Sequence, residues 1–395
     1  MSLVPHFERT TKNSTISHFL LTLGYKLFSF YFPLFLLEKG LSLPKVGFVY
    51  LLIYLPMAML SPLVGSISGK TNPFFLVISG ILGYSLYSMG MLLLPVSWFF
   101  YVLQIILGIS AALFFVGNRV IFMALHLNKL TRAFGWFHSA SYYASGFAPV
   151  IGAAVIFLWG FNGVFILSIL IYFINILFTF SSMPQKLNAQ LTVDSYANSL
   201  SQFGQIIKRS FAPNILPVLI FSLAILVLGG FYQSFFLIFL KSIGWGRTEI
   251  LAYSSLLSLI SLPISLYGIR MLFDSGIVEI IFIGGIMFAI SSLTIGLAVP
   301  LAGFIGILIL MEIGELGSFL SSSSRSGFIS KSFSFFPHGA AVLDTIFSPL
   351  GIVLGSFFGA LLIGHIGYPG IFILGGILIM FLAFFIKFPH PDIVE

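Results

Sequence analysis

Charged side chains inside long apolar stretches are the residues of this chain that could do chemistry. Lys26 lies in such a stretch, and Thr22 and Ser29 fall on the same face of a helix there. Glu312 and Glu315 are three residues apart in another stretch and share a helix face. An ionised side chain at the centre of a bilayer costs about 2.5–3.5 kcal/mol, so an unpaired, lipid-facing charge is not expected. These positions therefore predict a polar site inside a membrane.

Further polar residues join this set, and each has a packing interpretation beside the functional one. Arg119 and Asn118 lie below Gln104 on one face of an apolar stretch, although Arg119 could also reach the inner interface. Gln233 lies in a later stretch, and Asp344 lies in another. Each basic residue could instead only neutralise an acid and hold two helices together. We expect substrate or cavity contacts at Lys26, Thr22, Ser29, Gln104, Asn118, Arg119 and Gln233.

The charges inside the stretches do not balance, which predicts an acid that binds a proton. The set comprises three acids and two bases: Glu312, Glu315, Asp344, Lys26 and Arg119. Two carboxylates on one helix face repel each other, and both repulsion and desolvation favour the protonated form. We expect one of Glu312 and Glu315 to hold a proton and to release it when water or Lys26 comes near. Asp344 is the next candidate, and movement of a substrate without protons is the open alternative.

The composition requires a mostly lipid environment. Only 7% of the 395 residues are charged and 58% are hydrophobic, whereas a soluble chain carries about 25% charged residues. The net charge is +7, but the basic residues form no patch, so no nucleic-acid partner is expected. The chain has no cysteine, and no cluster shows metal-ligand spacing. We expect no metal and no cofactor.

Twelve apolar stretches are long enough to cross about 30 Å of hydrocarbon. Since lipid leaves backbone amides no outside partner, we expect all of them to be helices. The predicted fold is an all-α polytopic membrane protein of two pseudo-symmetric six-helix bundles. The stretches lie near 15–37, 45–68, 74–94, 98–122, 134–158, 161–182, 213–240, 248–270, 276–297, 301–323, 336–362 and 367–388.

Repeated signatures support the division into two bundles. Phe147-Ala148-Pro149 is echoed by Phe347-Ser348-Pro349, and Tyr31, Phe35 and Gly40 are echoed by Phe235, Phe239 and Gly244 at a nearly constant offset. We expect bundles over 1–182 and 213–395, joined by a cytoplasmic linker over 183–212. Tyr196, Leu200, Phe203 and Ile207 recur there at helical spacing, which predicts an amphipathic helix on the membrane face. A second, serine-rich loop is expected from Ser321 to Phe336.

The basic residues predict the orientation in the membrane. With the N-terminus inside, twelve Lys and Arg fall in cytoplasmic segments, and the outer loops hold only Lys39, Lys45, Lys241 and Arg247. Both termini are therefore expected in the cytoplasm, and the plasma (inner) membrane is the expected location. The first apolar stretch is too long for a signal-peptide core and is expected to remain as a span.

Six plus six spans, a long central loop and an internal repeat resemble the major facilitator superfamily of secondary transporters. Its pattern between spans two and three, G-x-L-A-D-R-x-G-R-K, is met by Gly65 and Lys70, with Gly69 at the acidic position. Its fifth-span pattern, G-x-x-x-G-P-x-x-G-G, reads Ala144-x-x-x-Ala148-Pro149-x-x-Gly152-Ala153. The resemblance implies that spans one, four, seven and ten line a central cavity. The fifth-span pattern is commoner in the family's exporters, which favours efflux.

A stripe of Gly351, Gly355 and Gly359 lets a neighbouring helix approach closely. It has two interpretations: ordinary helix packing, or a sliding contact between the two halves during transport.

The expected function is secondary active transport of a small molecule by alternating access, coupled to protons, by a monomer in the lipid bilayer. The chain shows no nucleotide-binding domain, so the energy would come from an ion gradient or the substrate gradient. The first alternative is an uptake permease for an organic anion, with Lys26 as the partner of the anion. A polytopic enzyme or a non-transporting receptor is the remote alternative, and an enzyme should show a compact acid/base or metal constellation near one interface.

Overall fold

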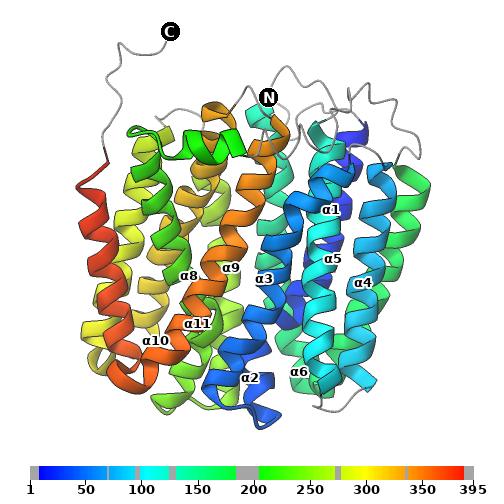
Figure 1. Ribbon diagram of the computed structural model, residues 1–395. Coiled ribbons are helices and arrows are strands. Elements are labelled where there is room, and N and C mark those ends of the chain that lie inside the picture. Colours follow the sequence, from blue (N-terminus) through cyan, green and yellow to red (C-terminus); the bar gives the residue numbers. More distant parts are fainter. Residues whose placement is uncertain are drawn as a thin grey trace. The chain divides into compact units, whose positions relative to one another are not determined.

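The computed structural model describes residues 9–68, 71–93, 98–123, 130–183, 204–271, 277–333 and 337–386, and every regular element in these ranges is a helix. The predicted all-helical class is therefore confirmed for this part of the chain (Figure 1). The helices are α1 (Arg9–Ser29), α2 (Phe32–Glu38), α3 (Leu43–Ser68), α4 (Pro73–Leu93), α5 (Trp98–Met123), α6 (Leu130–Ser182), α8 (Leu216–Ser242), α9 (Arg247–Met271), α10 (Ile277–Ser332) and α11 (Pro337–Ala383).

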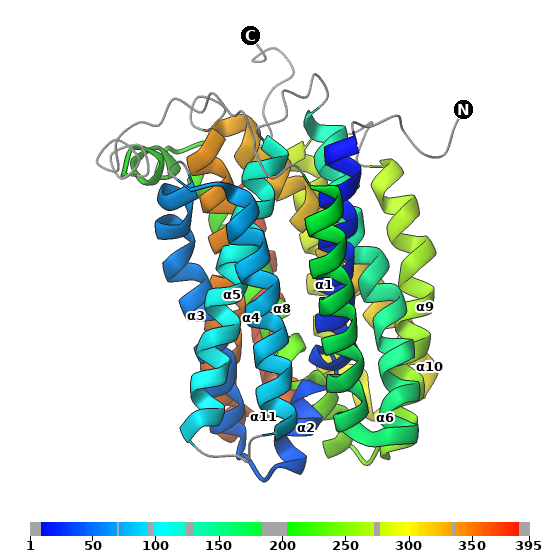
Figure 2. The ribbon, with the colours of Figure 1, turned by 90° about the vertical axis from the view of Figure 1, so that its right-hand side faces the viewer.

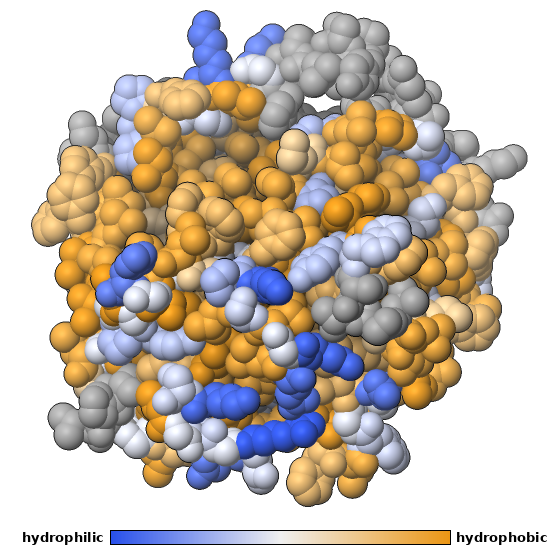
Figure 3. All heavy atoms as spheres, turned by 60° about the horizontal axis from the view of Figure 1, so that its bottom comes forward, coloured by the Kyte–Doolittle hydropathy of each residue, from blue (hydrophilic) through white to orange (hydrophobic). Residues whose placement is uncertain are grey.

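Nine helical stretches of the described residues are long and apolar enough to cross a membrane. Apolar side chains cover much of the surface in Figure 3, and hydrophilic side chains gather in the lower part of that view, where the bottom of Figure 1 comes forward. The helices α6, α10 and α11 are each interrupted by a glycine with positive φ: Gly160, Gly303 and Gly367. These breaks lie close to boundaries that the sequence predicts between consecutive spans. The total of twelve spans stays a prediction.

The chain forms two compact units, which divide α3 between them. The first unit comprises residues 1–32 and 55–200, and the second comprises 33–54 and 201–395. The division falls between Tyr54 and Leu55, and Pro56 follows at once inside the helix. Proline leaves one backbone carbonyl of a helix without its usual donor, which makes this a place where α3 can bend. The predicted bundle boundaries stay predictions, since much of the linker lies outside the described residues.

The first apolar stretch is not one helix, because α1 ends at Ser29 and α2 begins at Phe32. Pro33 explains the interruption, since its ring excludes the helical hydrogen bond that it would otherwise donate to the Ser29 carbonyl. Lys26 therefore lies in the last turn of α1, close to the break.

In the first unit, close approach and polar contacts hold α1 against α6. A Cβ on Gly152 would collide with the Leu27 carbonyl oxygen, so glycine is required for this contact. Nearby, the Tyr31 hydroxyl donates to the Pro149 carbonyl at 2.7 Å. Gly152 and Pro149 belong to the fifth-span pattern, as does the buried Ala148. In the structure this pattern joins α1 and α6.

In the second unit, the glycine stripe of α11 packs against α8. A Cβ on Gly351, Gly355 or Gly359 would meet atoms of Leu226, Val227 or Phe231, respectively. All of these residues belong to one unit. The interpretation of the stripe as a sliding contact between the halves is therefore wrong, and the packing interpretation holds, because a helix of the same unit occupies the groove that the missing side chains leave.

The serine-rich segment is helical rather than a loop, which corrects the prediction for 321–336 as far as the described residues reach. The helix α10 runs to Ser332, and Ser321 and Ser324 are buried within it. Serine hydroxyls can bond back to the preceding turn, as Ser326 does to the Ser322 carbonyl at 3.4 Å, so a run of serines does not break a helix in apolar surroundings.

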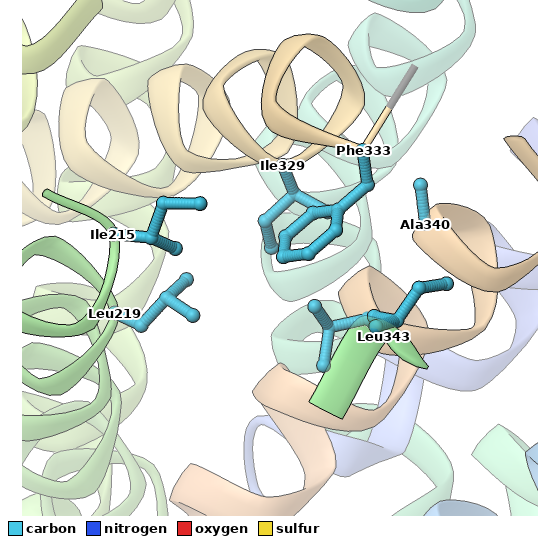
Figure 4. Packing of buried hydrophobic residues seen from close by; sticks show 7 residues of the cluster. Ile215, Leu219, Ile329, Phe333, Ala340 and Leu343 are labelled. Carbon is cyan, nitrogen blue, oxygen red and sulfur yellow. The ribbon is translucent and has the colours of Figure 1, made fainter. Parts of the chain in front are cut away.

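A hydrophobic cluster fixes the short helical stretch 204–210 to the second unit. Ile206 is fully buried there, whereas Ile207, which the sequence assigned to the apolar face, is 44% exposed. Figure 4 shows part of the cluster, in which side chains from α8, α10 and α11 converge. Its buried residues are Ile206, Ile215, Leu219, Ile329, Phe333, Ala340 and Leu343.

Two loops share one pattern of backbone hydrogen bonds, which supports the internal repeat. The Gly40 amide donates to the Leu37 carbonyl and the Gly244 amide to the Lys241 carbonyl, and the residue after each glycine bonds one position further back. Both glycines have positive φ, 79° and 99°, which side-chain-bearing residues rarely adopt. The four bonded residues of each loop, 36, 37, 40 and 41 in one and 240, 241, 244 and 245 in the other, match in pairs at a single offset along the chain.

Candidate functional site

Glu312 is a buried acid of the second unit. Glu312 belongs to α10 and is 8% exposed. The Ser261 hydroxyl of α9 donates to its Oε2 at 2.9 Å, while Oε1 is buried and accepts no hydrogen bond from the described residues. An ionised carboxylate buried with one oxygen unsatisfied is costly, and a bound proton removes much of that cost.

The surroundings of Glu315 differ from those of Glu312. Glu315 is exposed in the structure, one helical turn away on α10. Tyr253 of α9 lies within electrostatic reach of both carboxyl groups, and Tyr232 of α8 lies within reach of Glu315. The two acids, which the sequence could not tell apart, are thus distinguished by burial.

Asp344 has a basic partner that the sequence did not predict. Arg325 of α10 lies 3.6 Å from the Asp344 carboxylate, and both side chains are largely buried. Ser326 donates to the same carboxylate oxygen at 2.9 Å, and the guanidinium lies 5.8 Å from the centre of the Phe347 ring. An ion pair with these additional contacts stabilises the charged carboxylate, so Asp344 is not retained as a coupling residue.

Arg325 also changes the charge count. With it, the set contains three acids and three bases, so the expected uncompensated negative charge disappears. The case for a protonated acid therefore depends on the local surroundings of Glu312, and no longer on the count.

The predicted substrate residues of α1 lie in the first unit. Lys26 is half-buried, and Thr22 and Ser29 are 6% and 5% exposed. The Thr22 hydroxyl is buried and makes no hydrogen bond with the described residues. The structure thus places a cation and a buried hydroxyl on one helix, in a different unit from Glu312.

Two other predicted cavity residues have their side chains engaged by neighbouring helices. Gln104 is fully buried, donates to the Phe100 carbonyl at 2.9 Å and accepts from the Tyr87 hydroxyl at 3.2 Å. Asn118 is also fully buried and exchanges hydrogen bonds with the side chain and the backbone of Ser14. We leave both out of the site proposed below. Arg119, next to Asn118, is half-buried.

Gln233 has a specific partner that sequence reasoning missed. Its Nε2 donates to the Tyr54 hydroxyl at 2.8 Å, although the two residues are 179 positions apart. The Tyr54 ring is 8% exposed and stacks on the Tyr50 ring, with an angle of 5° between the planes. Tyrosine in an apolar run gives no signal of this role in the sequence.

The predicted motif between spans two and three is described only in part. The Gly65 carbonyl accepts a hydrogen bond from Ser68 at 2.6 Å, and the Asn72 side chain caps the start of α4 by accepting from the Phe74 amide at 3.0 Å. Lys70 lies outside the described residues. In the part of the chain that was described, no group of three or more His, Asp or Glu side chains could hold a metal ion.

The comparison with protein families decides the identity. The model of the Major Facilitator Superfamily matches residues 14–343. The chain belongs to this superfamily. It is therefore a multi-pass integral membrane protein and a transporter of small molecules, and not an enzyme. No curated protein sequence matches it.

Solved superfamily structures share the fold over nearly the whole chain. The nucleoside transporter NupG has a TM-score of 0.73 at 14% identity, with 95% of this chain and 97% of that chain covered. A D-xylose-proton symporter has a TM-score of 0.73 at 14% identity, with coverage of 96% and 98%. The human organic anion transporter MFSD10 (TETRAN) has a TM-score of 0.71 at 15% identity, with coverage of 97% and 100%. At these identities the likeness concerns the fold alone.

Proposed function

We propose that this superfamily member is a secondary active transporter that works by alternating access and couples transport to protons through Glu312. The observation that carries the proposal is the carboxyl group itself, buried on α10 with Oε2 held by Ser261 and Oε1 unsatisfied. A buried acid of this kind is a default functional candidate inside a membrane.

In the proposed cycle, Oε1 of Glu312 holds a proton while the group is shielded from water. When the site opens to one aqueous side, water solvates the carboxylate and the proton is released. Because the Ser261 hydroxyl bonds to Oε2, we assign the gain and loss of the proton to Oε1. One of the structural relatives is named as a D-xylose-proton symporter.

For the substrate side, we propose Lys26, Thr22 and Ser29 of α1, Arg119 of α5 and Gln233 of α8. On α1 a cation and two hydroxyl groups lie on one helix, which suits a small polar or acidic molecule. The Ala148-Pro149-Gly152 motif favours efflux. The alternative is an uptake permease for an organic anion, which Lys26 favours. The structural relative MFSD10 (TETRAN) is named as a human organic anion transporter.

We also propose the orientation and assembly predicted from the sequence: both termini in the cytoplasm, a location in the plasma (inner) membrane and a monomeric transporter. The ratio of basic residues between the two sides supports the orientation.

A two-step experiment tests the proposal. Purified protein is first screened by thermal shift against nucleosides, D-xylose and organic anions, the compounds named for the structural relatives above. The compound that stabilises the protein most is then offered to proteoliposomes with and without an imposed pH gradient. Accumulation only with the gradient is expected. Equal movement under both conditions, ending at equal concentrations, would contradict proton coupling, and stabilisation by anions alone would favour the alternative.

A further inference from the structure

The start of α3 is held by helices of the second unit through contacts that the transport proposal does not use. Residues 33–54 belong to that unit, whereas the remainder of α3 belongs to the first. Within this segment Val46, Val49 and Tyr50 are almost fully buried. We call residues 33–54 the outer segment, since the basic-residue distribution predicts that the α2–α3 loop faces outward.

One contact of the outer segment is a close helix–helix approach. A Cβ on Gly47 would lie 2.7 Å from Cβ of Ala360 and 2.8 Å from the carbonyl oxygen of Ser356, both on α11. Glycine at position 47 is thus what allows α3 to lie directly against α11. Such contact is favourable through packing alone and contains no directional bond.

A second contact is the ion pair between Glu38 of α2 and Arg247 of α9, at 3.8 Å. The two side chains are 43% and 53% exposed. Exposed pairs contribute little, and salt screens them, so this pair does not determine whether the segment stays in place.

The third contact is the hydrogen bond from Gln233 Nε2 to the Tyr54 hydroxyl, 2.8 Å long. Its acceptor is the last residue of the outer segment, immediately before the division of α3 and two residues before Pro56. A hydrogen bond in a largely buried setting is directional and is costly to leave unmade. It is therefore the contact best suited to fix the segment at one end.

We propose that Tyr54 is a positioning residue of the transport cycle, and that its bond to Gln233 holds the outer segment on the second unit until α3 bends at Pro56. While the bond exists, the Gln233 amide is occupied; when the segment leaves, that amide becomes available to an acceptor oxygen of the substrate. The proposal rests on alternating access, because only a cycle that moves the outer segment needs such a contact to open and close.

The test uses the fact that the chain has no cysteine. The variant Ala360→Cys places a single thiol beneath Gly47, where the outer segment covers it. Its rate of alkylation by N-ethylmaleimide is measured for the full chain in proteoliposomes, with no substrate and no gradient. A second reporter, Ser254→Cys, places a thiol at a fully buried site of α9 and detects general loosening of the unit.

We combine the Ala360→Cys reporter with either Tyr54→Phe or Gln233→Leu. Each change should raise the alkylation rate by about two- to twelvefold, the factor that corresponds to the net contribution of one hydrogen bond to stability. The two changes together should raise the rate no further than either alone, because both remove the same bond. The Ser254→Cys reporter should be unaffected.

Three results would each overturn the proposal. The first is an unchanged alkylation rate of the Ala360→Cys reporter, and the second is a double variant whose rate increase is the product of the two single increases. The third is an equal rate increase at the Ser254→Cys reporter. These outcomes are independent of the proposed function, since the assay needs neither substrate nor protons. A chain that shows the expected alkylation but no transport with any tested compound would contradict the transport proposal alone.

Discussion

At the scale of single residues, burial separates side chains that the sequence treats alike. Glu312 and Glu315 share a helix face, yet only Glu312 is withdrawn from solvent and bonded to Ser261. Asp344 is also acidic and inside an apolar stretch, but Arg325 and Ser326 satisfy it. The chemistry that each acid can perform therefore depends on the helix opposite to it.

The first prediction concerns the coupling residue. Glu312→Gln should lose accumulation driven by a pH gradient but keep exchange of substrate between compartments of equal pH, because the neutral amide resembles the protonated acid and cannot release a proton. Transport into proteoliposomes under both conditions measures this. Glu315→Gln is the matched control and should keep both activities. The reverse result would assign the coupling to Glu315.

A second prediction concerns the pair of Arg325 and Asp344. Arg325→Met should destabilise the protein by about 3–5 kcal/mol, because it leaves a largely buried carboxylate without its cation. Adding Asp344→Leu should recover most of the loss, since no uncompensated charge then remains. Equilibrium unfolding in detergent measures both variants, with Lys331→Met on the exposed end of α10 as control. A double variant as unstable as Arg325→Met would show that the charge is not the cause.

At the scale of helices, the two units use different means to bring equivalent helices together. In the first unit α1 and α6 combine Gly152 with polar contacts, among them the Asn175 side chain donating to the Ser17 carbonyl at 3.0 Å. In the second unit α8 and α11 rely on glycines facing a helix backbone. Close helix approach thus depends in the first unit on a glycine together with hydrogen bonds and in the second unit on a stripe of glycines, and both means stabilise helix pairs in lipid.

Adjacent glycines of α8 allow a matched test of this packing. A Cβ on Gly230 would lie 2.5 Å from the Ile352 Cα, whereas one on Gly229 would meet nothing within 4 Å. Gly230→Ala should therefore cost about 1–3 kcal/mol, because the backbone of α11 must move away. Gly229→Ala should be neutral or stabilise the protein by about 0.5–1 kcal/mol, because alanine favours the helix. Thermal unfolding of the two variants decides, and equal effects would contradict the packing.

Much of the fold was predictable from the sequence. A long apolar stretch in lipid must satisfy its backbone hydrogen bonds within the protein, which leaves few alternatives to a helix. Residues whose role depends on a neighbouring helix were not. Gln104 and Asn118 were assigned to a cavity, yet each bonds another helix, and polarity alone does not distinguish the two cases. Arg325 was assigned to a loop because of the serines around it, and Tyr54 gave no signal at all.

At the scale of the whole molecule, the orientation in the membrane is the property most open to a direct test. We predict that a thiol introduced at Ser42, in the exposed α2–α3 loop, reacts with a membrane-impermeant maleimide in intact cells. A thiol at Gln205, exposed in the helical stretch before α8, should react only after the cells are permeabilised. Since the native chain has no cysteine, each signal comes from one site. Labelling of both in intact cells would contradict the proposed topology.

The internal repeat allows one half of the protein to serve as a natural variant of the other. The Ser168 hydroxyl donates to the Gly24 carbonyl at 2.8 Å. Gly24 corresponds to Leu228 at the offset that relates Gly40 to Gly244, and Ser168 corresponds to Gly375 at the offset that relates the kink glycines Gly160 and Gly367. In the second unit Gly375 lies against the Leu228 side chain. The larger residue has moved from one helix of the pair to its neighbour, so a loss of volume on one side is compensated by a gain on the other. Replacing one residue by its counterpart from the other half should therefore destabilise the protein more than replacing both residues of the pair. The differences between the two halves thus identify contacts whose residues must change together.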